Sequence, residues 1–76
     1  MKDLLTHIIE GILGKKNFEI NEEVEGDFVR LMLKVPPEDT GLIIGRGGFT
    51  IKAIRNLIRV RATLEKKGAT VILQTG

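Results

Sequence analysis

The residues best suited to chemistry are four in a row, Gly45-Arg46-Gly47-Gly48, here called the glycine loop. A phosphodiester backbone approaches main chain closely only where no Cβ intervenes, so glycine is the residue that such a contact requires. Backbone N–H groups of the loop and of a following helix would face the phosphates, and Arg46 would pair with one of them. A short Gly-x-x-Gly is by itself more typical of a plain turn between helices, so its setting decides what it means.

Charge is distributed unevenly along the chain. Residues 1–44 contain five Lys/Arg and nine Asp/Glu, a net charge of −4. Residues 45–76 contain seven Lys/Arg against Glu65 alone, a net charge of +6, and the whole chain carries +2. This separation indicates one face that attracts a polyanion and another that repels it. A basic run alone is typical of a solvated helix face, but the glycine loop at its start favours the polyanion.

The first half of the chain is predicted to form a helix and a hairpin. Residues 1–13 place apolar side chains at helical spacing, and Gly14 is a favourable stop. Residues 18–24 alternate loosely between apolar and polar side chains, and residues 28–35 alternate more strictly. Glu25-Gly26-Asp27 between them is typical of a hairpin turn. Both strands would present one apolar face to a core.

The second half is predicted to form two helices and a strand. Pro36-Pro37 ends the second strand, because neither residue has an N–H to donate. A short helix then reaches the glycine loop, and a longer one runs from about Phe49 to Lys66 and stops at Gly68. Residues 70–74 form the last strand. The core stripe of the long helix is predicted to be Ile51, Ile54, Leu57, Ile58 and Ala62.

The setting of the glycine loop resembles a known family. Ile-Ile-Gly-x-x-Gly-x-x-Ile-x-x-Ile, after a proline-ended strand and within α-β-β-α-α-β order, looks like a KH domain of type II topology. Val35-Pro36-Pro37-Glu38-Asp39-Thr40-Gly41 and Thr50-Ile51-Lys52-Ala53-Ile54-Arg55 are similar to the bacterial single-KH-domain RNA-binding proteins called KhpA. The resemblance covers residues 1–76 as one α+β domain. It implies a three-stranded sheet backed by three helices, and a site for about four unpaired nucleotides.

The resemblance also implies which residues touch RNA. The glycine loop would hold phosphates, and isoleucines would line an apolar groove with Leu31 or Leu33 of the second strand. Independently of the resemblance, the long helix carries a basic stripe that begins beside the loop, formed by Lys52, Arg55, Arg59 and Lys66. A solubilising surface is the alternative, but beside the loop we expect Lys52 and Arg55 to contact RNA and leave Arg59 and Lys66 unassigned. The predicted RNA-binding residues are Gly45, Arg46, Gly47, Gly48, Thr50, Lys52, Arg55, Ile43, Ile44 and Ile51. Phe49 replaces a residue that is commonly basic in the family, and with the extra glycine Gly47 it predicts a weaker grip.

Four apolar residues of the long helix point away from both its core and its basic stripes: Phe49, Ala53, Val60 and Leu64. The pattern favours packing against the first or the second helix. The alternative is a self-association patch, because exposed apolar clusters tend to mark partner surfaces. The resembled family forms homodimers and pairs with a larger KH protein of the KhpB/Jag type, so the resemblance implies a dimer face here.

An enzyme is not expected, nor is a metal or cofactor. His7 is the only histidine and cysteine is absent, so neither a metal centre nor a nucleophile–base pair can be assembled. No apolar segment approaches the roughly 20 residues of a membrane span. The N-terminal residues lack the continuous apolar segment of a signal peptide, so we expect a cytoplasmic protein without a membrane partner.

The predicted function is non-catalytic binding of single-stranded RNA, as a post-transcriptional regulator or RNA chaperone. One alternative is a protein-interaction module that dimerises with a KH partner and binds RNA only incidentally. Another is a helix-turn-helix reader of duplex DNA, with residues 49–66 as the recognition helix. Asn56 is the only Asn or Gln in that helix, which disfavours base reading.

Overall fold

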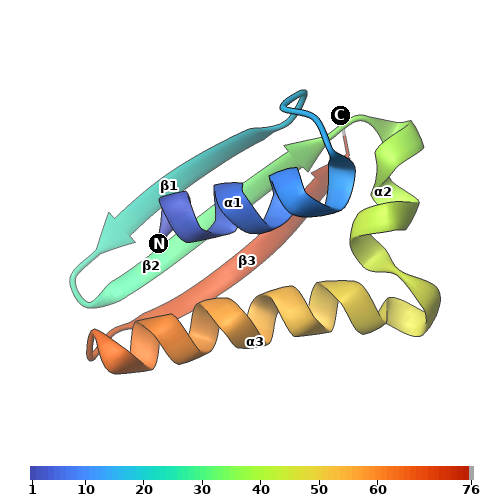
Figure 1. The fold of residues 1–76 in the computed structure, drawn as a ribbon. Helices are drawn as coiled ribbons and strands as arrows, with labels where there is room; N and C mark the ends of the chain where they lie inside the picture. Colours follow the sequence, from blue (N-terminus) through green and yellow to red (C-terminus); the bar gives the residue numbers. More distant parts are fainter. Residues whose placement is uncertain (76) are drawn as a thin grey trace.

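The computed structural model describes residues 1–75 and contains the predicted α-β-β-α-α-β order, with a short 3₁₀ turn added inside the glycine loop (Figure 1). Helix boundaries agree with the breakers in the sequence: α1 ends where Gly14 adopts a left-handed φ of 70°, and Pro37 opens α2. The elements are α1 (Lys2–Leu13), β1 (Glu19–Glu25), β2 (Phe28–Val35), α2 (Pro37–Ile44), η1 (Arg46–Gly48), α3 (Phe49–Leu64) and β3 (Gly68–Thr75).

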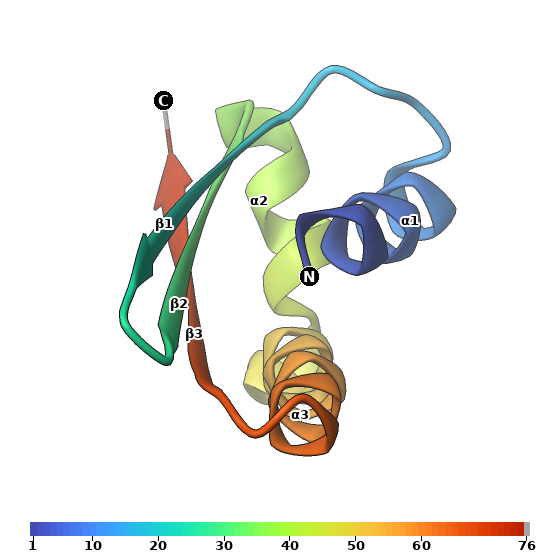
Figure 2. The same cartoon turned by 90° about the vertical axis from the view of Figure 1, so that its left-hand side faces the viewer.

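One mixed sheet organises the molecule. Its strand order is β1-β2-β3, with β1 and β2 antiparallel and β2 and β3 parallel. All three helices cover the same face of the sheet, and α3 lies along the edge strand β3 (Figure 2). The strands contribute Ile20, Val29, Leu31, Leu33, Val35 and Val71 to the core between these layers. The helices contribute Leu5, Ile9, Ile43, Ile51, Ile54, Ile58 and Ala62. The predicted sheet backed by three helices is thus confirmed.

The opposite face of the sheet is open to solvent and carries charged side chains on β1 and β2. Register places Glu19 beside Lys34 and Glu23 beside Arg30, two cross-strand neighbours of opposite charge. Phe28 lies over Gly68, where an added Cβ would come within 2.9 Å of its ring. A side chain at position 68 would therefore displace the ring that covers the start of β3.

The end of α3 differs from the prediction. The helix stops at Leu64 rather than Lys66, because Lys66 adopts a left-handed φ of 58°. The Lys67 N–H donates back to the Ala62 carbonyl oxygen at 2.8 Å, which closes the helix end. Gly68 is therefore the first residue of β3, held by its N–H to the Asp27 carbonyl oxygen at 2.8 Å. Within residues 1–75, no helix combines the length and apolar composition needed to cross a membrane.

The predicted core stripe of α3 was wrong at one position. Ile51, Ile54, Ile58 and Ala62 are buried, but the side chain of Leu57 is 54% exposed. At about 100° per residue, Leu57 stands a full quarter-turn from Ile58, outside the strip that the sheet covers. Leu57 belongs instead to the outward face of the helix.

A buried carboxylate ties the start of α2 to the connection between α1 and β1. Asp39 is 5% exposed, and its carboxylate forms an ion pair with Lys15 Nζ at 3.2 Å. Asn17 Nδ2 donates to the same carboxylate oxygen at 3.5 Å. These contacts fix the first turn of α2, and so the direction in which the helix delivers the chain to the glycine loop.

Candidate nucleic-acid interface

The glycine loop uses backbone conformations that favour glycine. Gly45, Gly47 and Gly48 have φ values of 75°, 63° and 77°, all in the left-handed region. Their ψ values of 174°, 18° and 13° turn the chain from the end of α2 into the first turn of α3. The Gly48 N–H donates to the Gly45 carbonyl oxygen at 3.2 Å and closes the turn. Three left-handed residues so close together require glycine, because a Cβ is costly there.

The glycines serve two different purposes. A Cβ on Gly45 would lie 2.7 Å from the Cβ and 2.9 Å from the backbone nitrogen of Thr50, so Gly45 permits the close packing that starts α3. At Gly47 and Gly48, by contrast, no atom of the described residues beyond their chain neighbours lies within 4 Å of such a Cβ. The surface over these two residues is therefore open main chain, accessible to a ligand.

The first turn of α3 adds a second feature that suits an anion. Its N-cap residue is Gly48, and among residues 1–75 no side chain makes a capping hydrogen bond to this end. The N–H groups of Thr50 and Ile51 therefore stay available at the positive end of the helix dipole. Thr50 itself is half-buried above Gly45. Open glycine backbone and an uncapped helix start together form a site suited to a phosphate.

Basic side chains surround this opening at different depths. Arg46 and Lys52 are exposed, one at the loop tip and one in the first turn of α3. Arg55 is directed toward β3, where its Nε donates to the Val71 carbonyl oxygen at 3.3 Å. Since β3 is an edge strand, this hydrogen bond satisfies a carbonyl oxygen that no neighbouring strand pairs. Arg55 thus joins α3 to the sheet, while the exposed Arg46 and Lys52 are free to follow a polyanion.

The structure corrects the predicted apolar groove. Ile43 and Ile51 are 0% and 7% exposed, and Leu31 and Leu33 are 0% exposed, so all four belong to the core. They point inward because they lie on the faces of α2, α3 and β2 that pack together. Ile44, 37% exposed at the last position of α2, is the predicted groove residue that does reach the surface beside the loop.

The outward face of α3 carries a continuous apolar row. Its large members are exposed, from 54% at Leu57 to 77% at Leu64, so the prediction that this row packs against α1 or α2 is wrong. The row, here called the outer stripe, consists of Phe49, Ala53, Leu57, Val60 and Leu64. Sequence reasoning missed Leu57, although its helical angle lies only about 20° beyond that of Leu64.

A pocket of about 300 Å³ interrupts the outer stripe near the C-terminal end of α3. Its lining residues are Asn56, Arg59, Val60, Thr63 and Leu64. The first four are spaced i, i+3, i+4 and i+7, which is the diamond of a hole on a helix surface that receives a knob from a facing helix. Nothing in the hydrophobic pattern signalled this hole, because two of those four residues are polar and one is charged.

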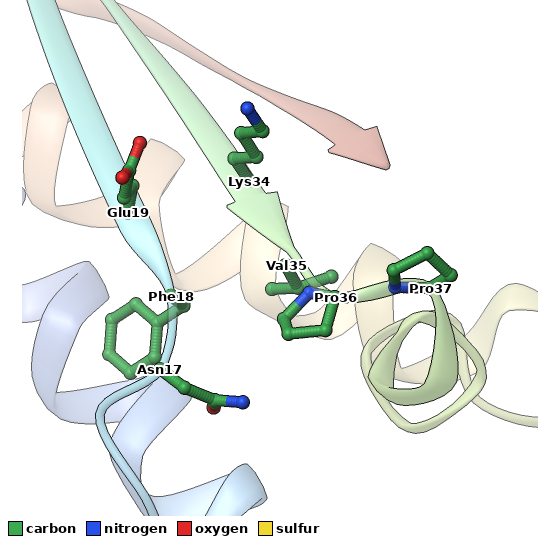
Figure 3. Close-up of a pocket in the computed structure, with 7 residues that line it drawn as sticks. All are labelled: Asn17, Phe18, Glu19, Lys34, Val35, Pro36 and Pro37. Atoms are coloured by element: carbon green, nitrogen blue, oxygen red, sulfur yellow. The ribbon is translucent and has the colours of Figure 1, made fainter. Parts of the chain in front are cut away.

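A second pocket, of about 210 Å³, opens where β1 begins and β2 ends (Figure 3). Phe18, Val35, Pro36 and Pro37 form its apolar part, with Glu19 and Lys34 beside them. This pocket lies at the first residue of α2, whereas the glycine loop follows the last residue of α2. Roughly 12 Å of helix therefore separates the pocket from the loop. This pocket is not part of the phosphate site.

The C-terminal end of α3 is a second cationic region. Arg61 Nε donates to Glu65 Oε2 at 2.7 Å, and this hydrogen bond holds the pKa of Glu65 below its ordinary value. Lys67 Nζ stands 4.0 Å from the other oxygen of the same carboxylate. Lys66 is exposed on its left-handed backbone. Residues 61–67 thus carry three cations against one carboxylate, and the region is positive.

The mixed three-stranded sheet, the three helices on one face and the glycine loop between α2 and α3 together define a KH domain of the α+β class. The family described as "KhpA/KhpB, KH domain" matches residues 2–74, and the chain belongs to this family. It is 36% identical to "RNA-binding protein KhpA" of Clostridium perfringens over 72 residues, 93% of this chain and 96% of that protein. It is 42% identical over the same shares to the protein of that name from Caldanaerobacter subterraneus subsp. tengcongensis.

Proposed function

We propose that this chain binds single-stranded RNA, with the glycine loop as the phosphate clamp. The observation that carries the proposal is the open main chain at Gly47 and Gly48 over the uncapped start of α3. A phosphate placed there meets N–H donors, a helix dipole and the guanidinium of Arg46. The relatives named RNA-binding protein KhpA support RNA as the polyanion.

The proposed site holds about four nucleotides. Arg46 and Lys52 neutralise phosphates, and Arg55 lies at the border of the site on the β3 edge. Ile44 supplies an apolar surface against which an unpaired base can lie. The helix-turn-helix alternative is disfavoured, because the outward face of α3 is apolar and offers few groups to the base edges of a duplex.

The test is a pair of loop variants that differ only in charge. Arg46→Asp with Gly47→Asp places two carboxylates in the clamp, while Arg46→Asn with Gly47→Asn places neutral side chains of the same shape. Both pairs share the cost of a side chain at the left-handed Gly47, about 1 kcal/mol. We expect the Asp pair to abolish binding to a pool of labelled RNA decamers, and the Asn pair to weaken it about tenfold.

The Asn pair also controls for stability. Because the backbone strain is shared, both variants should melt a few degrees below the unaltered protein, at nearly the same temperature. If the Asp variant melts with the Asn variant and still binds RNA as the unaltered protein does, the glycine loop is not the clamp.

The outer stripe supports a second proposed role, which is self-association. Five apolar residues in the outer stripe of a sixteen-residue helix form an exposed surface of the kind that marks partner sites. We propose that the chain forms a homodimer through this row. Light scattering after size exclusion should show a dimer, and Val60→Asp should convert it to a monomer with little change in far-ultraviolet circular dichroism.

The same surface is proposed to accept a larger KH protein of the KhpB/Jag type, since the matched family includes both kinds of domain. Such a partner would compete with the second copy of this chain. Mixing the two purified proteins should replace the homodimer by a heterodimer, and Val60→Asp should prevent this. Within a cell, RNA binding by such dimers fits an RNA chaperone or a post-transcriptional regulator. A protein that dimerises normally but gives no crosslink to RNA in cells would instead support the interaction module.

A further inference from the structure

The outer stripe contains a knob and a hole at opposite ends. Phe49, 76% exposed in the first turn of α3, is the protruding residue. The hole lies around Val60, one to two turns from the helix C-terminus, with Arg59 at its rim. An aromatic ring suits that rim, because a guanidinium stacks on aromatic faces. Phe49 cannot reach the hole of its own helix, which is several turns away.

Two copies can fill both holes at once in one arrangement. In a two-fold dimer whose helices run parallel, each residue faces its own copy, so Phe49 would meet Phe49 and both holes would stay empty. With antiparallel helices, Phe49 of each copy faces the hole of the other. Parallel pairing would also bring the two cationic glycine loops side by side, which antiparallel pairing avoids.

The antiparallel register has a consequence for the RNA site. With the partner's Phe49 opposite Val60, the partner's glycine loop lies beside the last turn of α3, just short of Lys66 and Lys67. The loop tip and these lysines would be offset by about 5 Å along the helix axis and separated by one interhelical spacing of about 8–10 Å. A lysine side chain spans much of that gap, and a phosphate bound between them would meet both.

Resting on the proposed RNA function, we propose that the RNA clamp is completed in trans. Each site consists of the glycine loop of one copy and of Lys66 and Lys67 of the other. The sheet order supports this, because the carboxylates of β1 lie at the sheet edge remote from α3 and leave the α3 end positive. A basic residue at position 49 would add charge to the site of its own copy only. Phe49 instead binds the partner, whose lysines supply the charge.

Complementation between two defective variants tests the proposal. The first is the Arg46→Asp with Gly47→Asp protein, whose glycine loops are expected not to bind RNA. The second carries Lys66→Gln and Lys67→Gln, which removes charge without adding repulsion beside Glu65. We expect the second variant to bind the RNA decamer pool about tenfold more weakly at moderate salt. Mixed dimers of the two would contain one site with an intact loop and intact lysines.

After exchange of an equimolar mixture, half of the dimers are mixed, so about a quarter of the sites are whole. RNA binding with the affinity of the unaltered protein should therefore return, at about a quarter of the sites that the same amount of unaltered protein offers. Native mass spectrometry measures the share of mixed dimers. If mixed dimers form but binding does not return, or if the lysine variant binds normally, completion in trans is wrong while the loop proposal stands. If the first variant binds RNA by itself, the loop proposal fails instead.

An engineered disulfide fixes the orientation independently, since the chain has no cysteine of its own. Phe49→Cys with Val60→Cys should give a covalent dimer on oxidation, whereas Val60→Cys alone should not. A rapid crosslink in the single variant would show that the helices run parallel and would overturn the proposal.

Discussion

The two faces of α3 are both apolar, yet the structure gives them opposite roles. The inner face, Ile51, Ile54, Ile58 and Ala62, is buried against the sheet and the other helices. The outer stripe is of similar length and hydrophobicity, and solvent reaches most of it. A row of apolar residues therefore predicts only that this face of the helix is a contact surface. The position of the sheet decides whether the contact is made within the same chain or with another one.

The strongest test of the difference between the two faces substitutes two neighbouring residues, Ile58 on the inner face and Leu57 on the outer face. Ile58→Ala leaves a cavity in the core and should lower the free energy of unfolding by about 2–5 kcal/mol. Leu57→Ala should change it by less than about 0.5 kcal/mol at protein concentrations where the chain is monomeric. Denaturant unfolding at several concentrations measures both. Equal losses at the lowest concentration would mean that Leu57 is packed within its own chain.

A charge on the outer stripe should separate association from folding. Val60→Asp buries a carboxylate in the proposed interface and should weaken self-association by about 100-fold or more. The monomer should keep its melting temperature, because Val60 is exposed there. Sedimentation equilibrium gives the association constant. Thr63→Asp, on the rim of the same hole, is the matched variant and should weaken association less.

The salt dependence of RNA binding links the outer stripe to the clamp. Each phosphate neutralised contributes about −0.7 to the log-log slope, so a four-nucleotide site predicts a slope of roughly −2 to −3 for the unaltered protein. Val60→Asp, as a monomer, should lose the contacts made by the partner's lysines and give a slope smaller in magnitude by about 1. An unchanged slope in a proven monomer would show that the outer stripe does not contribute to RNA binding by the clamp.

The smallest expected effect concerns Phe49, which belongs to the stripe and adjoins the loop. Phe49→Lys removes the knob but adds a cation beside the phosphates. The variant should be monomeric, with RNA affinity within about tenfold of the unaltered dimer, because one local lysine replaces charge that the partner supplied. Phe49→Gln, which lacks the cation, should bind more weakly than Phe49→Lys. Equal affinities of the two variants would show that no charge is needed there.

Much of the fold could be predicted because local signals agreed with one another. Proline at the end of β2, glycine at 14 and 26 and the alternation of residues 28–35 each placed a boundary that the structure shows. The end of α3 was missed, because the left-handed residue is Lys66 and no propensity points to a lysine. The contacts around Gly68, made by Asp27 and Phe28, explain why the strand begins there.

The candidate site was predictable in its backbone and less so in its side chains. The sequence placed the glycine loop between two helices, and the structure adds that Gly45, Gly47 and Gly48 have left-handed φ values. Which isoleucines line a surface depended on the rotation of α2 and α3 against the sheet. That rotation buried Ile43 and Ile51 and left Ile44 partly exposed. Adjacent helical residues differ by about 100°, so a modest rotation exchanges core for surface.

By itself the sequence determined the order of elements, the KH-type loop and the cationic second half, because glycine, proline, charge and periodicity act over a few residues. Only the tertiary structure decided that the outer stripe is uncovered, that a hole lies near Val60, and that Arg55 joins α3 to the edge of β3. These features depend on how far the sheet extends beneath each helix. Burial is set by contacts between segments distant in the chain, and no local pattern of residues records them.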